Sequence, residues 1–414
     1  MTRRVLVLGQ SPGLIDALAR ISNDVPQVFL LVEPSVLEAH PGEFEHRIVT
    51  EIRTARYVFS DEAVDVGVAW HAEVGFDAVL PGKEHAVRAA AAIADKLDMG
   101  YPGAKAVAAC TDKLRFRELA SGAGFPTPAF RAVDTPADVG EFVDACEGRA
   151  VVLKPRNRNG SLGVRYIGDP DEISVAWEQS VATDEGTHKP LDRKLEWMYL
   201  VEEYLPGPEF SVELLVQAGE IVFVNVTAKT VGELPWFPET AHQVPAVVPS
   251  PLRALLTASA RRLVRALEVR DGLLHSEWRL TGERAYPIEC ALRFPGDRIP
   301  WLIELAYGIN LADAWLHCLD HTQHVIAATA HRFAAIRFLQ AAAGLVTGVH
   351  GLEEFEAAHR VSEVSAPELG DILPEARDSH SRPGFVVFDA DTLDGLKAAI
   401  ADFDATVRVE TRRP

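Results

Sequence analysis

The sequence predicts a multidomain protein of mixed α/β and α+β class that opens with a Rossmann-like domain built on a parallel sheet. Three observations predict this class. The chain has 414 residues, enough for two or three domains at ~150 residues each. Strand and helix patterns alternate up to about residue 105, which is typical of a parallel sheet. From Ala150 onward, strands separated by short turns take over.

The composition is that of an acidic globular protein. Apolar residues make up 48% of the chain, and 60 acidic against 41 basic residues give a net charge of −19. This charge opposes attraction to nucleic acid or to anionic membranes. No stretch approaches the ~18 apolar residues of a membrane span. The four cysteines form no C-x-x-C pair, which indicates a reducing, cytoplasmic location rather than a disulfide framework.

The predicted N-terminal domain covers residues 1–110. Val5–Leu8 is its expected first strand, the turn GQSPG leads into a helix, and Val28–Val32 forms the second strand. Lys83–Leu97 is a further helix that ends at a Gly and Pro signal. Dinucleotide binding, with Glu33 at a ribose, is disfavoured against a plain tight turn because the spacing G-x-G-x-x-G is absent.

The rest of the chain divides into two predicted subdomains. Residues 111–200 open with a helix capped by Thr111 and contain the strands VVLKP and SLGVRYI. Residues 201–414 contain the strands FSVELLV and IVFVNVT, the helix Leu252–Leu267 and a closing α+β part. The stretch 232–251 is expected to be an irregular loop.

The stretch GLLHSEWRLTGERAYPIECALRF has the pattern of a β-hairpin with two facing acids. Side chains alternate along a strand, and with a three-residue loop, Gly282–Arg284, Glu277 lies directly across from Glu289. Their Cβ atoms would be ~5 Å apart, which is repulsive unless a cation lies between them. A Mg²⁺ ion with carboxylate ligands suits this position. The alternative is an exposed hairpin whose acids are bridged by Arg279 and Arg293.

Two upstream segments have features of a nucleotide site. Lys154 ends a strand and precedes a glycine-containing turn, Asn159–Gly163, whose backbone N–H groups could hold phosphate oxygens. An ordinary hairpin loop is the alternative. In YLVEEYLPGPEF, Glu202 and Glu203 end a strand and Glu209 follows a turn. Acids in this position suit ribose hydroxyls or an amino group, with plain surface charge as the alternative.

The order of these features along the chain resembles that of the ATP-grasp ligases. Lys113, Lys154 with its glycine turn, the segment EEYL, and the two facing glutamates followed by Arg293 follow the layout of that superfamily. Within it, PGKEHAVRAAAAIADKL, TDKLRFRELASGAGFPTP, the HSE triplet and ECALRFPGD most resemble the carboxylate–amine ligases that include L-amino-acid (dipeptide) ligases. The resemblance spans most of the chain and implies an ATP-grasp fold.

The resemblance also implies where ATP would bind. The implied contacts are Lys113 and Lys154 to the phosphates, Gly160, Ser161 and Gly163 in a mobile loop that covers them, Glu202 near the adenine amino group, the backbone of Glu203 and Leu205 at the adenine edge, and Glu209 at the ribose.

The metal and substrate sites are implied in the same way. Glu277 and Glu289 are similar to the ligands of Mg²⁺, with Mn²⁺ as the alternative ion, and Arg293 is similar to the arginine that steadies the transferred phosphoryl group. Lys154 and Arg293 are therefore the catalytic candidates, and His275 is the candidate general base for the amine. Three residues are expected near the substrate: Glu239, His242 and Gly296.

The implied reaction joins a small carboxylate to an amine through an acyl phosphate, and amino acids are the expected substrates. The protein is expected to form a homodimer. One position departs from the family pattern. The last strand reads Glu289, Cys290, Ala291 where the family commonly has Glu-x-Asn, and an alanine cannot coordinate, so the number of metal ions stays open. Two other functions also stay open: a different ATP-grasp reaction, such as that of a carboxylase or purine-type ligase, and non-catalytic nucleotide binding.

Overall fold

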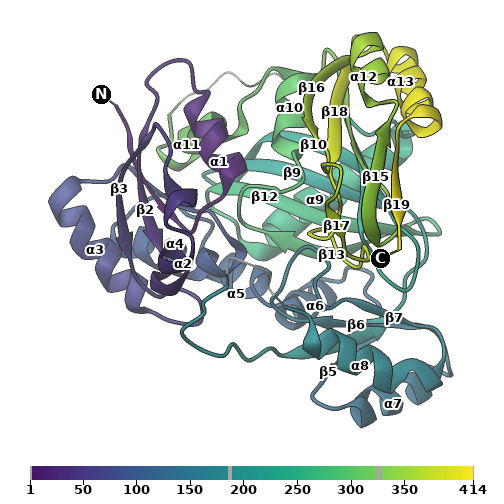
Figure 1. Ribbon diagram of the computed structural model, residues 1–414. Helices are drawn as coiled ribbons and strands as arrows, with labels where there is room; N and C mark the ends of the chain where they lie inside the picture. Colours follow the sequence, from purple (N-terminus) through teal and green to yellow (C-terminus); the bar gives the residue numbers. More distant parts are fainter. Residues whose placement is uncertain (1, 185–188, 323–325, 327–328, 414) are drawn as a thin grey trace.

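The computed structural model describes residues 2–184, 189–322, 326 and 329–413, whose strands form four sheets (Figure 1). The N-terminal sheet has the order β3-β2-β1-β4 and is parallel, which confirms the predicted Rossmann-like domain. Val5 to Leu8 are fully buried because helices cover both faces of this sheet. Its elements are β1 (Arg4–Leu8), α1 (Pro12–Ala19), β2 (Gln27–Val32), α2 (Pro34–Ala39), η1 (Pro41–Phe44), β3 (Val49–Thr54), α3 (Glu62–Val74), β4 (Ala78–Pro81), η2 (Glu84–Ala86) and α4 (Val87–Lys96).

Glu33, at the carboxyl end of β2, is a structural residue. Its carboxylate accepts hydrogen bonds from the backbone N–H groups of Tyr57 and Val58, at 2.8 and 2.7 Å. Arg193, from the segment that precedes the strand beginning at Tyr199, donates to both of its oxygens. The carboxylate is fully buried, so it does not face a ribose, and the plain-turn interpretation of GQSPG fits.

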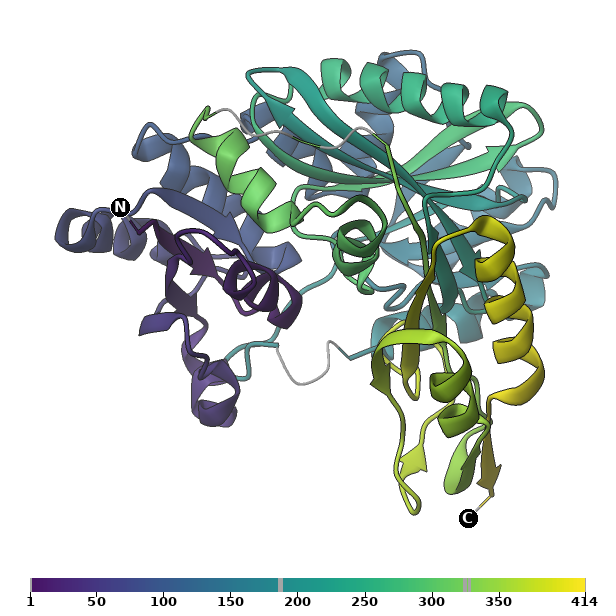
Figure 2. The ribbon, with the colours of Figure 1, turned by 90° about the horizontal axis from the view of Figure 1, so that it is seen from above.

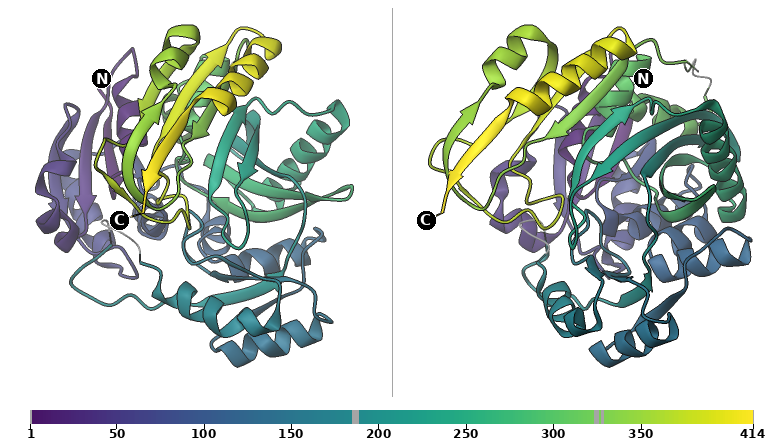
Figure 3. Two further views of the ribbon diagram at one scale, coloured as in Figure 1. Left: turned by 45° about the vertical axis from the view of Figure 1, so that its right-hand side comes forward. Right: turned by 90° about the vertical axis from the view of Figure 1, so that its right-hand side faces the viewer.

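A second, antiparallel sheet forms the small subdomain. Its order is β5-β8-β6-β7, and Figure 3 shows it set apart from the N-terminal domain and the large sheet. Two helices pack on it through Val139, Phe142 and Ile173. The elements are β5 (Phe130–Val133), α7 (Pro136–Ala145), β6 (Val151–Pro155), β7 (Arg165–Ile167), η3 (Pro170–Glu172), α8 (Ile173–Ala182) and β8 (Tyr199–Glu203).

An eight-stranded antiparallel sheet forms the centre of the molecule, in the order β13-β12-β9-β10-β11-β14-β18-β16. One face is covered by α9, α5 and α6, and the other by α10 and α11, which also contact the N-terminal domain. The strands up to β14 and their helices are α5 (Ala104–Cys110), α6 (Lys113–Gly122), β9 (Glu209–Gln217), β10 (Glu220–Val231), β11 (Glu239–Val244), α9 (Ser250–Leu267), β12 (Gly272–Thr281), β13 (Arg284–Ala291), α10 (Ile299–Tyr307), α11 (Leu311–Leu319) and β14 (Phe333–Phe338).

Two local predictions were wrong. Asp112, not Thr111, caps α6, because its carboxylate accepts from the N–H of Leu114 while the Thr111 hydroxyl donates back to the carbonyl of Val107. The stretch 232–251 is not wholly irregular, since β11 lies within it and pairs with β10 and β14. Cross-strand pairing, which short-range sequence patterns do not record, decides this second case.

The C-terminal part extends the large sheet and adds a small sheet in the order β17-β15-β19. Figure 2 shows it projecting from one end of the large sheet. Phe355, Phe388 and Phe403 form its core. No helix in the described ranges is long and apolar enough to cross a membrane. The remaining elements are β15 (Gly344–His350), α12 (Leu352–Ala358), β16 (Arg360–Ser365), β17 (Ile372–Leu373), β18 (Phe385–Ala390), α13 (Leu393–Thr406) and β19 (Arg408–Arg412).

Candidate active site

A cavity of about 250 Å³ lies between the small sheet, the large sheet and a loop of the C-terminal part. The fold brings to it all the predicted site residues except Gly163 and His242. Those that line it are Lys113, Lys154, Gly160, Ser161, Glu202, Glu203, Leu205, Glu209, Glu239, His275, Glu277, Glu289, Arg293 and Gly296. Sequence reasoning missed several polar residues of the same lining: Arg158, Lys229, Asp297, His380 and Arg382.

Lys154 belongs to a buried charge cluster on the small sheet. Its ammonium donates to Glu202 on the neighbouring strand β8, and Arg117 of α6 donates to the same carboxylate at 2.8 and 3.2 Å. Burial lowers the pKa of Lys154 to about 8, and Glu202 offsets only part of that shift. Burial by itself would raise the pKa of Glu202, but Arg117 and Lys154 outweigh it and lower that pKa to about 2.

The hairpin places Glu277 opposite Glu289 as predicted, but its loop length and strand register differ from the prediction. The loop has two residues rather than three, because Thr281 pairs with Arg284. A β-bulge between Glu277 and Trp278 adds one residue to β13 and restores the predicted pairing. The two carboxylates face the cavity with cations beside them: Lys113 lies 2.9 Å from Glu289.

His275 lies next to this pair and is engaged on both ring nitrogens. Nδ1 is 3.0 Å from the buried carboxylate of Glu213, and Nε2 is 3.3 Å from Glu277. Burial by itself would lower the pKa of His275, but these two contacts outweigh it and raise the pKa to about 9. A protonated imidazole with two carboxylate partners cannot accept a proton at neutral pH. The role of general base for His275 stays a prediction, and its two carboxylate contacts favour a role in positioning Glu277.

The glycine turn after β6 lies over the cavity, although only part of it faces inward. Gly160 and Ser161 both have left-handed backbones, at φ values of 65° and 58°, and both line the cavity. The Ser161 hydroxyl donates to the carbonyl of Phe237 at 3.1 Å. Gly163 faces away from the cavity, where a Cβ would lie 3.1 Å from the carbonyl oxygen of Ser180. Its contribution is close packing against α8.

The segment after β8 has backbone groups that are already partly used. The N–H of Glu203 donates to the carbonyl of Ala129 at 2.9 Å, so only its carbonyl could meet an adenine ring. The carbonyl of Leu205 accepts from Arg279 at 2.8 Å. Arg279 also donates to Glu209 at 3.1 Å, which holds that carboxylate at the edge of the cavity.

Two segments of the chain match known protein families. Residues 148–300 match the ATP-grasp domain, and residues 337–412 match the L-amino acid ligase C-terminal domain 2. The first match contains Lys154, Glu277 and Glu289 in one domain. The chain belongs to the ATP-grasp ligases.

Individual relatives agree with this assignment. The crystal structure of an L-amino acid ligase from Bacillus licheniformis has a TM-score of 0.79 at 22% identity and covers 99% of both chains. Dapdiamide A synthase from Enterobacter agglomerans is 25% identical over 84% of each chain. A D-alanine–D-alanine ligase from Marinobacter nauticus is 31% identical over a matched region that covers 36% of this chain and 40% of that enzyme.

In this ATP-grasp ligase, Lys229 of β10 is the main cavity residue that the sequence did not reveal. Its side chain is 1% exposed, and its ammonium lies 2.5 Å from Glu277 and 3.4 Å from Glu209 and also contacts Glu239. Burial by itself would lower the pKa of Lys229, but the three carboxylates raise it well above its usual value. The only sequence signal was a single lysine in the apolar strand IVFVNVTAKTV.

The carboxylates of the ATP-grasp cavity fit a hard divalent cation. Glu209, Glu239 and Glu277 each offer one oxygen within 4.8 Å of the others, and Glu289 faces Glu277 across the hairpin. Oxygen donors of this kind are what Mg²⁺ prefers. Ala291 pairs with His275 on the same hairpin and offers no donor, so a further ligand has to come from another strand.

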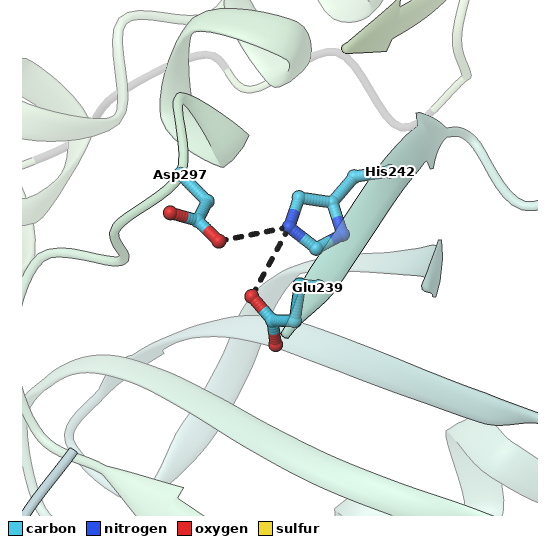
Figure 4. A group of neighbouring side chains, drawn as sticks. All are labelled: Glu239, His242 and Asp297. Carbon is cyan, nitrogen blue, oxygen red and sulfur yellow. Dashed lines mark hydrogen bonds and ion pairs between the residues drawn. The ribbon is translucent and has the colours of Figure 1, made fainter. Parts of the chain in front are cut away.

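Glu239, His242 and Asp297 form a cluster of neighbouring side chains (Figure 4), and the two carboxylates of this cluster line the cavity. His242 Nε2 lies 3.2 Å from Asp297 and 3.4 Å from Glu239. Burial by itself would lower the pKa of His242, but the two carboxylates raise it. His242 is behind the cavity surface, and its predicted contact with substrate would have to pass through Glu239 and Asp297. Arg382 donates to both oxygens of Asp297, at 2.9 and 2.6 Å.

Arg293 enters the cavity from the turn after β13 and is oriented by the N-terminal domain. Its Nε donates to Glu84, at 2.7 Å, at the start of η2. Its Nη1 donates to the carbonyl of Phe294 at 3.0 Å. Two consecutive left-handed residues follow Gly296, Asp297 at φ 54° and Arg298 at φ 59°. This backbone turn points the carboxylate of Asp297 toward the same cavity.

Proposed function

We propose that this ATP-grasp ligase uses ATP to join a small carboxylic acid to an amine, with an amino acid as at least one substrate, so that the product is an amide or dipeptide. One observation carries the proposal. A single cavity combines the lysines suited to phosphates, Lys113 and Lys154, with facing carboxylates suited to Mg²⁺ and an acidic wall suited to an ammonium group. The names of the similar ligases point in the same direction.

The first step is attack of a substrate carboxylate oxygen on the γ-phosphorus of ATP, which breaks the bond to the β-phosphate oxygen and releases ADP. The product is an acyl phosphate. Phosphoryl transfer depends mainly on positioning and charge neutralisation. Lys113, Lys154 and Lys229 line the cavity as buried or half-buried cations, and Arg293 adds a guanidinium. We assign these four groups to the phosphate oxygens.

Glu277 and Glu289 are the residues we propose to hold Mg²⁺, with Glu209 and Glu239 within reach of the same ion. When bound, Mg²⁺ neutralises charge on the phosphates. His275 contacts Glu277 through Nε2 and is itself held by Glu213 through Nδ1, so it would keep Glu277 in place. The same cavity could hold Mn²⁺, which accepts the same oxygen donors.

The second step is attack of the amine nitrogen on the acyl carbon, which expels inorganic phosphate and leaves an amide. The amine must lose a proton during this step, and no base is assigned to it. Glu239 and Asp297 would bind the ammonium group of an amino-acid substrate, because they are anionic groups on the cavity wall. The glycine turn at Gly160 covers the cavity and would protect the acyl phosphate from water.

ADP release measured across pairs of amino acids and small carboxylates, with mass detection of products, tests the proposal. We expect ADP release that requires both substrates, and a product whose mass is that of the two substrates combined less one water. ADP release that requires bicarbonate and yields a carboxylated product would instead favour a carboxylase. ATP binding without ADP release across the whole panel would favour a non-catalytic nucleotide-binding protein. Two further predictions, a homodimer and a cytoplasmic location, can be tested by light scattering and by cell fractionation.

A further inference from the structure

A loop of the C-terminal part, residues 374–382, reaches the glycine turn that covers the cavity. We call it the C-terminal loop. The N–H of Ser379 donates to the carbonyl of Gly160 at 3.1 Å. Arg382, at the end of the loop, pairs with Asp297 and also donates to the carbonyl of Glu239 at 3.2 Å. The loop is therefore attached both to the glycine turn and to the opposite wall of the same cavity.

The C-terminal loop has an internal network that fixes its shape. The carboxylate of Asp378 accepts from the N–H groups of His380 and Ser381, each at 2.9 Å. The hydroxyl of Ser381 accepts from the N–H of Arg377 at 2.9 Å. Arg377 also lies over the ring of Trp236, 5.1 Å from its centre. These contacts hold the backbone at His380 and so restrict where its side chain can point.

The imidazole of His380 lies directly on Gly160. A Cβ at Gly160 would be 2.7 Å from Nε2 of His380, so the ring occupies the space above that glycine. Both residues line the cavity beside Lys154 and Arg158. Among the residues that the structure describes, the ring of His380 has no hydrogen-bond or ion-pair partner. By contrast, both ring nitrogens of His275 are taken up by carboxylates.

We propose that His380 is a nucleotide-phosphate-binding residue, supplied to the ATP-grasp cavity by the C-terminal part. This rests on the proposed function, because it takes the glycine turn to cover the phosphates of ATP. An imidazole N–H in this position donates to a phosphate oxygen, and a hydrogen bond to a charged group is stronger than one between neutral groups. Ser379 then keeps the glycine turn closed over the phosphates, and the C-terminal part becomes a component of the nucleotide site.

The test compares His380→Ala with His350→Ala, a matched control on β15 whose side chain is 43% exposed and pairs with Glu410. Calorimetry measures the affinity of each variant for a non-hydrolysable ATP analogue and for adenosine. We expect His380→Ala to lower the affinity for the ATP analogue by ~10-fold or more, the loss typical of one hydrogen bond to a charged group. The affinity for adenosine should stay unchanged. Unchanged affinity for the analogue would overturn the proposal, and so would an equal loss for adenosine, since that would indicate a structural effect.

Two further variants keep the test informative if His380→Ala folds poorly. His380→Gln keeps an N–H donor of similar reach and should recover part of the analogue affinity; no recovery in a folded variant would count against a donor role. In Gly160→Ala the added methyl group should push against the His380 ring. The loss of analogue affinity in the double variant should therefore be smaller than the sum of the losses in Gly160→Ala and His380→Ala. Strictly additive losses would contradict the contact.

The measurement is independent of amide formation. Absence of ADP release across all amino-acid pairs would refute the ligase function while leaving the phosphate contact of His380 supported by the binding data. Amide formation together with an unchanged affinity of His380→Ala for the ATP analogue would support the ligase function and refute the phosphate contact of His380.

Discussion

Replacing Lys229 by methionine removes the ammonium that three carboxylates share. At an effective dielectric constant of ~20, Coulomb's law gives about 7 kcal/mol for the contact with Glu277 at 2.5 Å and about 5 kcal/mol for that with Glu209 at 3.4 Å. The cost of burying the ammonium offsets much of this attraction. Removal of one partner from a buried ion pair typically costs ~3–5 kcal/mol of stability.

The remaining contacts place the expected loss at the lower end of that range. Glu209 keeps Arg279 at 3.1 Å, and Glu277 keeps His275 at 3.3 Å. Glu239 likewise keeps His242 at 3.4 Å. Because every carboxylate retains one hydrogen-bond or ion-pair partner, we expect Lys229→Met to lose about 3 kcal/mol.

Calorimetric unfolding of wild type, Lys229→Met and Lys229→Arg measures this loss. For a unit of 150–250 residues, each kcal/mol lowers the midpoint by roughly 2–4 °C. Lys229→Arg keeps the charge and should lose less. In Lys229→Met, Glu239 and Glu277 lose the ammonium that lowers their pKa values in the wild type, so the folded variant binds protons more readily. The stability deficit of the variant should therefore shrink as the pH falls from 8 to 5. A variant that melts with wild type at pH 8 would refute the reasoning.

Mg²⁺ provides a second measurement on the same variant. Glu209, Glu239 and Glu277 lie close enough to share one ion, so Mg²⁺ should raise the midpoint of Lys229→Met more than that of wild type. An equal response of both proteins would show that these carboxylates do not bind the ion once the lysine is gone.

Three other predictions concern single residues. The pKa of Lys154 is about 8, so its cation is lost as the pH rises through that value and the affinity for ATP should fall. Calorimetric titration with ATP from pH 7 to 9 should show a weaker fall in affinity for Lys154→Arg than for wild type. An identical fall in both proteins would contradict the assignment of Lys154 to the phosphates. Glu289→Ala should abolish ADP release with an unchanged circular dichroism spectrum, and near-normal turnover would remove it from the metal site. Glu33→Gln should destabilise the protein by ~3 kcal/mol, because a buried carboxylate bonded to Arg193 loses its charge. The affinity for ATP, measured by titration, should stay at the wild-type value. Weakened binding would show that Glu33 also serves the nucleotide site.

Much of the nucleotide and metal site follows from local rules in the sequence. The two-residue periodicity of a strand places Glu277 and Glu289 on one face, and this held even though the loop is one residue shorter than predicted, since a bulge compensates. The run of strand and helix patterns likewise predicted the N-terminal parallel sheet. Both predictions rest on residue patterns within short segments of the chain.

What the sequence by itself determined is therefore the hairpin pair, the lysines at a helix start and a strand end, and the order of the elements. Only the tertiary structure decided which charges meet. Sheet order places β10 beside β9 and so brings Lys229 to Glu209, and the packing of α6 on the large sheet brings Arg117 to Glu202. The protonation of His275 depends on Glu213, a residue 62 positions away. Charge interactions act through space, and the spacing of residues along the chain does not encode those distances.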